Sequence, residues 1–246
     1  MTERLYIVTG ASRGLGAALA EQVLAPGVTL LGLSRGRHAG LAALAEAAEA
    51  TVEQWPVDLA EPLPVAARLE AWLGRVDAQR FDAAVLVNNA ALIPSAGPLE
   101  SIAPDELARV LRVGLEAPLL LAGAFLRATR GWRAERRVLQ VSSGLGRRPM
   151  AGQATYCAIK AGLDHAARAM ALDGARVAAV APGVIDTDMQ AQLRASDSAQ
   201  FPEHQLFVDM KRGGQLDTPT QAAAKLLALL RREDFGSQPV TDVRGL

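Results

Sequence analysis

The sequence predicts an α/β protein built on a doubly wound parallel sheet, with helices on both faces in three α/β/α layers. Short, continuously apolar runs alternate along the chain with longer segments of helical periodicity. The connections between them are short, so each strand-helix-strand unit is expected to make a right-handed crossover. Buried parallel strands are apolar throughout, as these runs are. The 246 residues suit one domain over residues 1–246 rather than two.

The periodicity places six strands and six helices in alternation. The strands are expected at Leu5–Thr9, Val28–Ser34, Thr51–Val57, Ala83–Asn88, Arg137–Ser142 and Arg176–Ala181. The helices are expected at about 14–25, 39–49, 62–78, 104–130, 153–172 and 218–232.

Two segments break the alternation: 91–103, which contains Pro94, Gly97 and Pro98, and 184–216, which shows no convincing strand. Long irregular segments in a compact domain usually carry function. In such sheets ligands bind outside the carboxyl ends of the strands, where these segments emerge. We expect segment 184–216 to form a lid.

Composition excludes several classes of function. The 26 basic and 26 acidic side chains give no net charge, which argues against a nucleic-acid partner. No apolar run is long enough to span a membrane and the start shows no signal-peptide pattern, so a cytoplasmic protein is expected. Cys157 is the one cysteine, and the histidines lack ligand spacing, so neither a disulfide nor a metal site is expected.

A glycine-rich turn follows the first predicted strand. The segment Thr9–Gly16 (TGASRGLG) leads into the first predicted helix. Glycine permits a tight turn and lets backbone amides approach a pyrophosphate at the positive end of a helix. This position favours a dinucleotide site, with an ordinary structural turn as the alternative.

The end of the second predicted strand indicates which dinucleotide. An acidic residue there bonds the ribose diol of NAD(H), whereas a cation accepts the 2′-phosphate of NADP(H). The segment Gly32–Arg37 (GLSRGR) has no acid. Arg35, with Arg13 from the glycine turn, can make forked contacts with a phosphate. We therefore expect NADP(H), and the alternative is that these arginines are merely solvated.

A tyrosine and a lysine four residues apart point to the chemistry. Tyr156 and Lys160 share one face of a predicted helix. A tyrosine with its free pKa near 10 is a weak catalyst at neutral pH, and we expect the Lys160 ammonium to lower the pKa of Tyr156. Ser143 ends the fifth predicted strand, where its hydroxyl can bond a substrate carbonyl that Tyr156 protonates. Taken alone, Ser143 would be explained as a strand-end turn.

Several of these segments, in order and over nearly the whole chain, resemble the short-chain dehydrogenase/reductase family. They are Thr9–Gly16, Asn88-Asn89-Ala90, Ser143, Tyr156-x-x-x-Lys160 and Ala181-Pro182-Gly183. Within the family, Tyr156-Cys157-Ala158, segment 183–190 (GVIDTDMQ) and segment 234–237 (DFGS) resemble the sepiapterin reductase and benzil reductase branch. The resemblance implies a Rossmann-like fold and hydride transfer with a nicotinamide cofactor.

The resemblance also implies which residues contact the cofactor, with Asp58 and Leu59 at the adenine, Asn89 and Ala90 near its ribose, and Lys160 at the nicotinamide ribose. The full set is Gly10, Ser12, Arg13, Gly14, Leu15, Gly16, Arg35, Asp58, Leu59, Asn89, Ala90, Tyr156, Lys160, Pro182, Gly183, Ile185 and Thr187. Two simpler alternatives are a helix cap at Asp58 and solvated loop charges at Asp186 and Asp188.

The chain departs from the family pattern at Gly114, where the family usually has an asparagine. That asparagine bends the helix, and its main-chain carbonyl holds a water in a proton relay to the lysine. Pro118 has no N–H and cannot bond the carbonyl of Gly114. We therefore count Gly114 among the catalytic residues, acting through its backbone, at a helix cost of about 1 kcal/mol.

The branch resemblance implies one further substrate residue. An aspartate in the C-terminal strand of sepiapterin reductases anchors the pterin, and Asp242 falls where that motif places it. The expected substrate contacts are therefore Ser143, Tyr156 and Asp242. The alternative for Asp242 is an ordinary charge near the chain end.

Together these observations predict an NADPH-dependent carbonyl reductase acting on a ketone, a dicarbonyl or a pterin-like side-chain carbonyl, with Tyr156 as general acid. A dehydrogenase that oxidises a secondary alcohol is one alternative. A non-catalytic NADP(H)-binding regulatory protein, favoured only by Gly114, is another. Family members pair through helices equivalent to 104–130 and 153–172, which implies a homodimer or homotetramer, although core packing explains the same apolar faces.

Overall fold

The computed structural model of the chain describes residues 3–245, which form a single seven-stranded sheet flanked by helices. All strands are parallel, in the order β3-β2-β1-β4-β5-β6-β7. They are β1 (Arg4–Thr9), β2 (Val28–Ser34), β3 (Thr51–Pro56), β4 (Ala83–Asn88), β5 (Glu135–Val141), β6 (Val177–Ala181) and β7 (Val240–Asp242). The doubly wound prediction is confirmed, and the six expected strands are all present.

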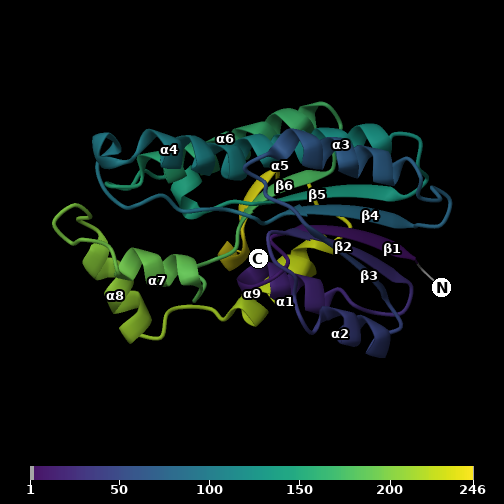
Figure 1. Cartoon of the computed structure of the whole chain (residues 1–246), viewed down its shortest axis with the longest axis horizontal. Helices are drawn as coiled ribbons and strands as arrows, with labels where there is room; N and C mark the ends of the chain where they lie inside the picture. Colours follow the sequence, from purple (N-terminus) through teal and green to yellow (C-terminus); the bar gives the residue numbers. More distant parts are fainter. Residues whose placement is uncertain (1–2, 246) are drawn as a thin grey trace.

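Helices cover both faces of the sheet (Figure 1). On one face lie α1 (Gly14–Gln22), α2 (Leu41–Ala47) and α9 (Pro219–Leu230), and on the other lie α3 (Pro62–Leu73), α4 (Pro104–Leu111), α5 (Ala117–Ala128) and α6 (Ala154–Leu172). Single-turn helices occur at Leu99–Ser101, Gly144–Gly146 and Val243–Gly245. No helix within residues 3–245 is long and apolar enough to cross a membrane.

The two cores lie on opposite faces of the sheet because successive side chains of a strand point to opposite sides. In β1, Leu5 and Ile7 pack with the residues of α3 and α5, whereas Tyr6 and Val8 pack with those of α1 and α9. All four side chains are at most 3% exposed. The strand order reverses between β1 and β4, and the carboxyl ends of the strands at this point are where such sheets bind ligands.

The expected helix 104–130 is interrupted. A π-helical turn over Arg112–Glu116 separates α4 from α5, and the N–H of Ala117 donates to the carbonyl of Arg112. Gly114 lies inside this turn and is buried. Turns of this kind occur frequently at functional sites.

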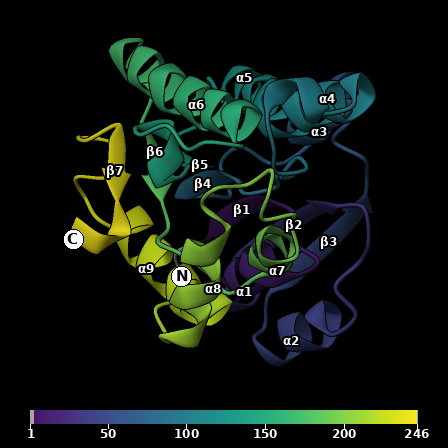
Figure 2. The same cartoon turned by 90° about the vertical axis from the view of Figure 1, so that its left-hand side faces the viewer.

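Segment 184–216 is more regular than expected, because it contains α7 (Asp188–Arg194) and α8 (His204–Arg212). These helices extend beyond the carboxyl ends of the strands (Figure 1), and Figure 2 shows this end with α7 and α8 toward the viewer. They bury a small apolar cluster of their own around Leu193, Phe201 and Phe207, which Ile93 joins from the segment after β4. Segment 91–103 is irregular as predicted, apart from one short turn.

Candidate active site

A large cleft of about 1350 Å³ opens at the carboxyl edge of the sheet. It is bounded by the turn before α1, the segments after β2, β4 and β5, the first turns of α6, and the lid segment 184–216. Every residue that the sequence predicts for the site lines this cleft, with the exception of Gly114. Residues from far apart in the chain therefore meet in one place.

The backbone of the glycine turn folds closely against itself. Gly10 and Gly14 have φ angles of 70° and 56°, which side chains disfavour. A Cβ atom on Gly16 would lie 2.1 Å from the carbonyl oxygen of Gly10, so any side chain there would force the turn apart. The turn thus brings the N-terminus of α1 to the cleft, where its free N–H groups suit a phosphate.

Thr9 joins this turn to the segment after β4. Its hydroxyl accepts hydrogen bonds from the backbone N–H groups of Asn89 and Ala90, both at 2.9 Å. The Asn89 side chain donates in return to the Thr9 carbonyl at 2.9 Å. These bonds position two walls of the cleft against each other, a role for Thr9 that periodicity alone could not indicate.

The expected phosphate-binding arginines differ in their surroundings. Arg35 is exposed at the edge of the cleft and forms no ion pair with any residue that the structure describes. Arg13 is paired with Asp188 of α7 across the cleft, with both side chains largely exposed. A phosphate would therefore meet Arg35 directly, whereas Arg13 has to exchange one partner for another.

The carboxylates of Asp58, Asp186 and Asp188 each bond or pair with another residue. Asp58 bonds the N–H of Ala60 at 2.9 Å and pairs with Arg109, but it does not cap α3, which begins after Glu61. Asp186 pairs with Lys211 of α8, and Asp188 pairs with Arg13. Each of these two carboxylates thus has a basic partner at the surface, and their contact with the cofactor stays a prediction.

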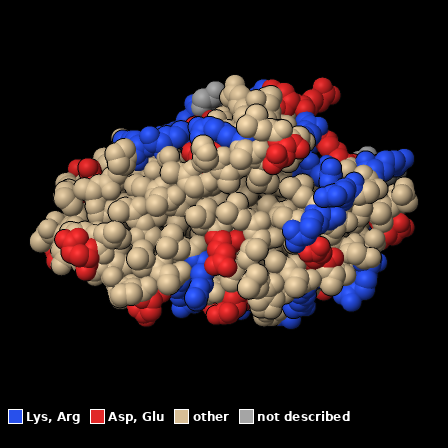
Figure 3. Space-filling model, turned by 90° about the horizontal axis from the view of Figure 1, so that it is seen from above, with Lys and Arg blue, Asp and Glu red and all other residues tan. Residues whose placement is uncertain are grey.

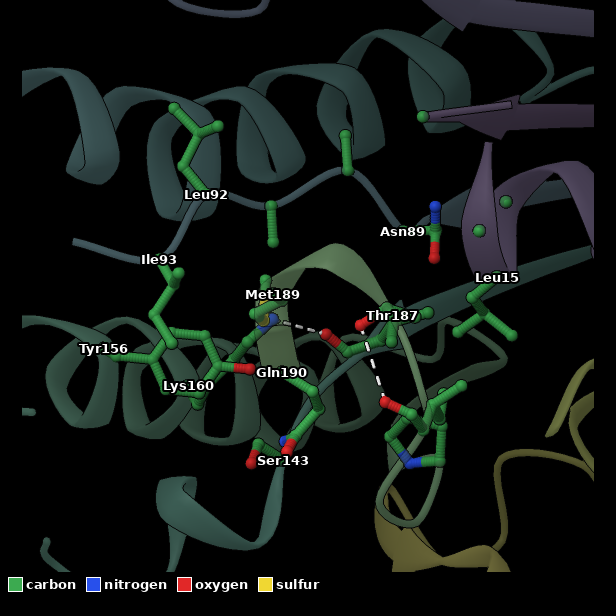
Figure 4. A pocket seen from close by; sticks show the side chains of 18 of the residues that line it. Leu15, Asn89, Leu92, Ile93, Ser143, Tyr156, Lys160, Thr187, Met189 and Gln190 are labelled. Carbon is green, nitrogen blue, oxygen red and sulfur yellow. Dashed lines mark hydrogen bonds between the residues drawn. The ribbon is translucent and has the colours of Figure 1, made fainter. Parts of the chain in front are cut away.

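Ser143, Tyr156 and Lys160 come together in the middle of the cleft, as Figure 4 shows. The first turns of α6 carry Tyr156 and Lys160, and the Lys160 Nζ atom lies 5.4 Å from the centre of the Tyr156 ring. Ser143 follows β5, and its hydroxyl accepts a hydrogen bond from the N–H of Leu145 at 3.2 Å. A hydroxyl, a phenol and an ammonium thus face the same space.

The expected effect of Lys160 on Tyr156 is not found. Burial raises the pKa of Tyr156 to about 12, and the nearby Ser143 side chain opposes this rise only in part. Burial likewise lowers the pKa of Lys160 to about 8, against a smaller opposing effect of Asp164. The physical reason is that desolvation penalises both charged forms, the phenolate of Tyr156 and the ammonium of Lys160.

Behind the three residues lies a buried polar group that the sequence did not single out. The Lys160 ammonium donates to the Val141 carbonyl at 2.7 Å. Asp164, one helical turn further along α6 and 1% exposed, accepts a hydrogen bond from Ser142 and lies 3.6 Å from Arg147. The spacing Lys160 to Asp164 is the only sequence signal for it, because the same helix face carries both.

Gly114 and Asp242 are the two predicted site residues whose roles the structure leaves as predictions. Gly114 is buried against α6 and is absent from the cleft lining, although the adjacent Val113 lines it. Its relay role stays a prediction. Asp242 lines the cleft, but its carboxylate is held by Arg244 at 2.6 and 2.9 Å and lies 3.7 Å from Arg147. The Arg244 guanidinium lowers the pKa of Asp242, and a substrate bound there would share the carboxylate with this arginine, so its substrate role stays a prediction.

Comparison with known proteins agrees with this geometry. The short chain dehydrogenase family pattern matches residues 4–198, and the chain belongs to this family of oxidoreductases, which use a nicotinamide cofactor. Benzil reductase ((S)-benzoin forming) of Bacillus cereus is 30% identical over 94% of this chain and 96% of its own. Sepiapterin reductase of Xenopus laevis is 30% identical over 95% of this chain and 92% of its own.

Solved structures show the same fold. A short-chain dehydrogenase/reductase from Burkholderia vietnamiensis is 37% identical and covers 99% of this chain and 98% of its own, with a TM-score of 0.67. The KRED1-Pglu enzyme is 27% identical over 94% of this chain and 98% of its own, with a TM-score of 0.80.

Proposed function

We propose that the protein is an NADPH-dependent carbonyl reductase that transfers hydride to a ketone, a dicarbonyl or a pterin-like side-chain carbonyl. The observation that carries this proposal is the meeting of Ser143, Tyr156 and Lys160 in one cleft that is also lined by Arg35, which has no ion pair within residues 3–245. The glycine turn, which excludes a side chain at Gly16, fits the pyrophosphate of a dinucleotide in this cleft. The cofactor supplies the hydride when it is bound.

Tyr156 acts as the proton donor in this proposal. With a pKa of about 12, the phenol stays protonated across the neutral range, which is the form that a reductase needs. Ser143 donates a hydrogen bond to the same substrate oxygen and orients it. Lys160 is charged below its pKa of about 8 and stabilises the negative charge that develops on Tyr156 as the proton leaves.

The same pKa describes which protonation state of Tyr156 is present before the reaction. Oxidation of a secondary alcohol requires Tyr156 to begin as a phenolate, and burial makes that form unfavourable. The protonated phenol suits reduction, and assays of both directions with NADPH and NADP separate this function from the alcohol dehydrogenase alternative. A regulatory protein without turnover would have no use for this arrangement of Ser143, Tyr156 and Lys160.

The substrate end of the cleft is shaped by apolar side chains. Ile93, Met150, Met189, Leu193 and Phe207 line it, and three of them belong to the lid segment 184–216. Such a wall suits aromatic or bulky carbonyl compounds. The likeness to benzil reductases supports the same class of substrate, whereas a pterin anchored at Asp242 would share its carboxylate with Arg244.

We further propose that the protein works in the cytoplasm as a homodimer. Figure 3 looks onto the helical layer of α3 to α6 and shows a broad central area with few charged side chains. Leu119 of α5 and Leu172 of α6 are 39% and 90% exposed. Mass measurement in solution tests the dimer, and a monomer at micromolar concentration would contradict it.

The central test is turnover. NADPH oxidation should be measured with benzil and related ketones, for the parent protein and for Tyr156→Phe. We expect the phenylalanine variant to lose turnover by about 100-fold or more, because general acid catalysis contributes that much. Equal turnover by both proteins would contradict the role of Tyr156.

A further inference from the structure

Gln153 is a buried side chain whose amide has no partner. The residue is 1% exposed, and neither its Nε2 nor its Oε1 atom has a hydrogen-bond partner among the residues that the structure describes. It lines the same cleft as Ser143 and Tyr156. A buried amide without a partner is unfavourable, so its presence beside a ligand cleft indicates that a ligand supplies the partner.

The local structure around Gln153 shows no structural role for its side chain. Gln153 immediately precedes α6, yet its side chain makes no capping hydrogen bond. By contrast, Gln221 completes a capping box with Thr218 at the start of α9. The Gln54 amide is likewise used, because it bonds both the N–H and the carbonyl of His38, at 2.8 and 3.2 Å. Gln153 differs from these two glutamines, because no residue that the structure describes bonds its amide.

The position of Gln153 relates it to the reacting oxygen. It lies three residues before Tyr156 and directly before the first turn of α6, and both residues line the cleft. The nearby lining residues Ile93, Met150 and Leu193 are apolar and offer no hydrogen bond to a ligand. A polar group of the substrate placed next to the reacting carbonyl would therefore find its partner at Gln153.

A second carboxamide faces the same space from the lid. Gln190 of α7 lines the cleft, and its buried Oε1 atom has no partner within the described chain. Figure 4 shows its side chain reaching from α7 toward Ser143. The two amides thus belong to different parts of the cleft wall, one to the residue before α6 and one to the lid.

We propose that Gln153 is a specificity-determining residue that recognises a second oxygen of the substrate, on the carbon next to the reduced carbonyl. Ser143 and Tyr156 bond the oxygen that is reduced, and the Gln153 amide donates to its neighbour. The cleft then prefers vicinal dicarbonyls over simple ketones of the same size. This inference rests on the proposed carbonyl reductase function and names the substrate class within it.

The test compares two substrates that differ only in the second oxygen. Benzil carries both carbonyl groups, and deoxybenzoin has the same two rings with one carbonyl. We expect Gln153→Met to lower kcat/KM for benzil by about tenfold, the effect of one lost neutral hydrogen bond, and to leave kcat/KM for deoxybenzoin unchanged. Because the variant removes an unpaired buried amide, its unfolding temperature should be equal to or above that of the parent.

Gln140→Met is the matched control. Gln140 of β5 is also 1% exposed with both amide atoms unpaired, but it does not line the cleft. Its variant should show the same change in stability and an unchanged ratio of kcat/KM for benzil to that for deoxybenzoin. A change in this ratio equal to that of Gln153→Met would overturn the assignment.

The outcomes for the parent protein separate this inference from the proposed function. If the parent reduces neither ketone with NADPH or NADH, the proposed function fails and the inference fails with it. If the parent reduces benzil and Gln153→Met shows the same ratio as the parent, the inference alone is overturned. An equal loss on both ketones in Gln153→Met would also overturn it, because that pattern indicates a general structural role.

Discussion

Gly114 and Ile159 occupy complementary volumes where the π-helical turn packs on α6. A Cβ atom on Gly114 would lie 2.9 Å from Cγ2 and 3.1 Å from Cδ1 of Ile159, which is 1% exposed. Ile159 directly precedes Lys160, so this contact lies beneath the catalytic face of α6. The residue that departs from the family pattern is thus tied to a bulky partner that fills the space beside it.

This contact predicts that Gly114→Ala changes the free energy of unfolding in opposite directions in the parent and in an Ile159→Ala variant. In the parent, Gly114→Ala should lower the free energy of unfolding, because overpacking costs about 1–3 kcal/mol and outweighs a helix-propensity gain of about 1 kcal/mol. In an Ile159→Ala background the overlap is gone, and Gly114→Ala should become stabilising. Urea unfolding of the four proteins measures the coupling. Additive effects would show that the two residues do not constrain each other.

The pKa of Lys160 predicts the pH dependence of reduction. Its charged form assists proton transfer from Tyr156, and burial lowers the pKa of Lys160 to about 8. As pH rises through this value the ammonium is lost, so log kcat/KM for carbonyl reduction should fall above about pH 8. Lys160→Arg keeps its charge at higher pH and should remove the falling limb, whatever its absolute rate.

Tyr156 offers an independent check on the same electrostatics. The chain has two tyrosines, Tyr6 and Tyr156, so the difference between the absorbance titrations of the parent and Tyr156→Phe isolates one phenol. With a pKa of about 12, Tyr156 should show no phenolate at pH 10. Ionisation of that phenol below pH 9 would contradict the role of burial in setting its pKa.

The sequence predicts the order of strands and helices well, because each element buries one side against the sheet and so carries a clear period. The prediction fails where contacts between segments distant in the sequence determine the secondary structure. The lid helices α7 and α8 have seven and nine residues, and they are fixed by packing of Phe201 and Phe207 that no local period reveals. The three-residue β7 is too short to carry a period of its own.

The sequence likewise predicts one part of the site and not another. Spacing alone brings Tyr156 and Lys160 to one helix face, but it carries no information on how deeply they are buried, and burial reverses the expected direction of the Tyr156 pKa. The role expected of Asp242 depends on which side chains surround it. Arg244, two residues further on, occupies its carboxylate, a contact that the residue order permits but does not require.

Asp164 predicts a second pH effect, this time on stability. Burial raises the pKa of Asp164 above its ordinary 3.8. Between the unfolded and folded pKa values the native state holds more protons, so the parent loses stability as pH rises through this window. Asp164→Asn removes this dependence and still accepts the hydrogen bond from Ser142. The advantage of Asp164→Asn over the parent should therefore grow from pH 4 upward and then level off. Urea unfolding at several pH values checks this, and parallel curves would contradict it.

Arg35 predicts the choice between the two dinucleotides. Arg35 lines the cleft and has no ion pair within the described residues, so it is free to bond a 2′-phosphate. Arg35→Leu should raise KM for NADPH by about 10–100-fold, since a hydrogen bond to a charged group contributes about 1.5–3 kcal/mol. KM for NADH, which lacks that phosphate, should stay within about twofold of the parent.

Arg37→Leu is the matched control for this prediction. Arg37 is exposed, lies two residues further along the same loop, and does not line the cleft. Its loss changes the net charge by the same amount, so an effect of overall charge would appear equally in both variants. Arg13→Leu should give a smaller rise in KM for NADPH than Arg35→Leu, because Arg13 must first leave Asp188. An equal rise in KM for NADPH and NADH in Arg35→Leu would show that Arg35 supports the loop and does not read the phosphate.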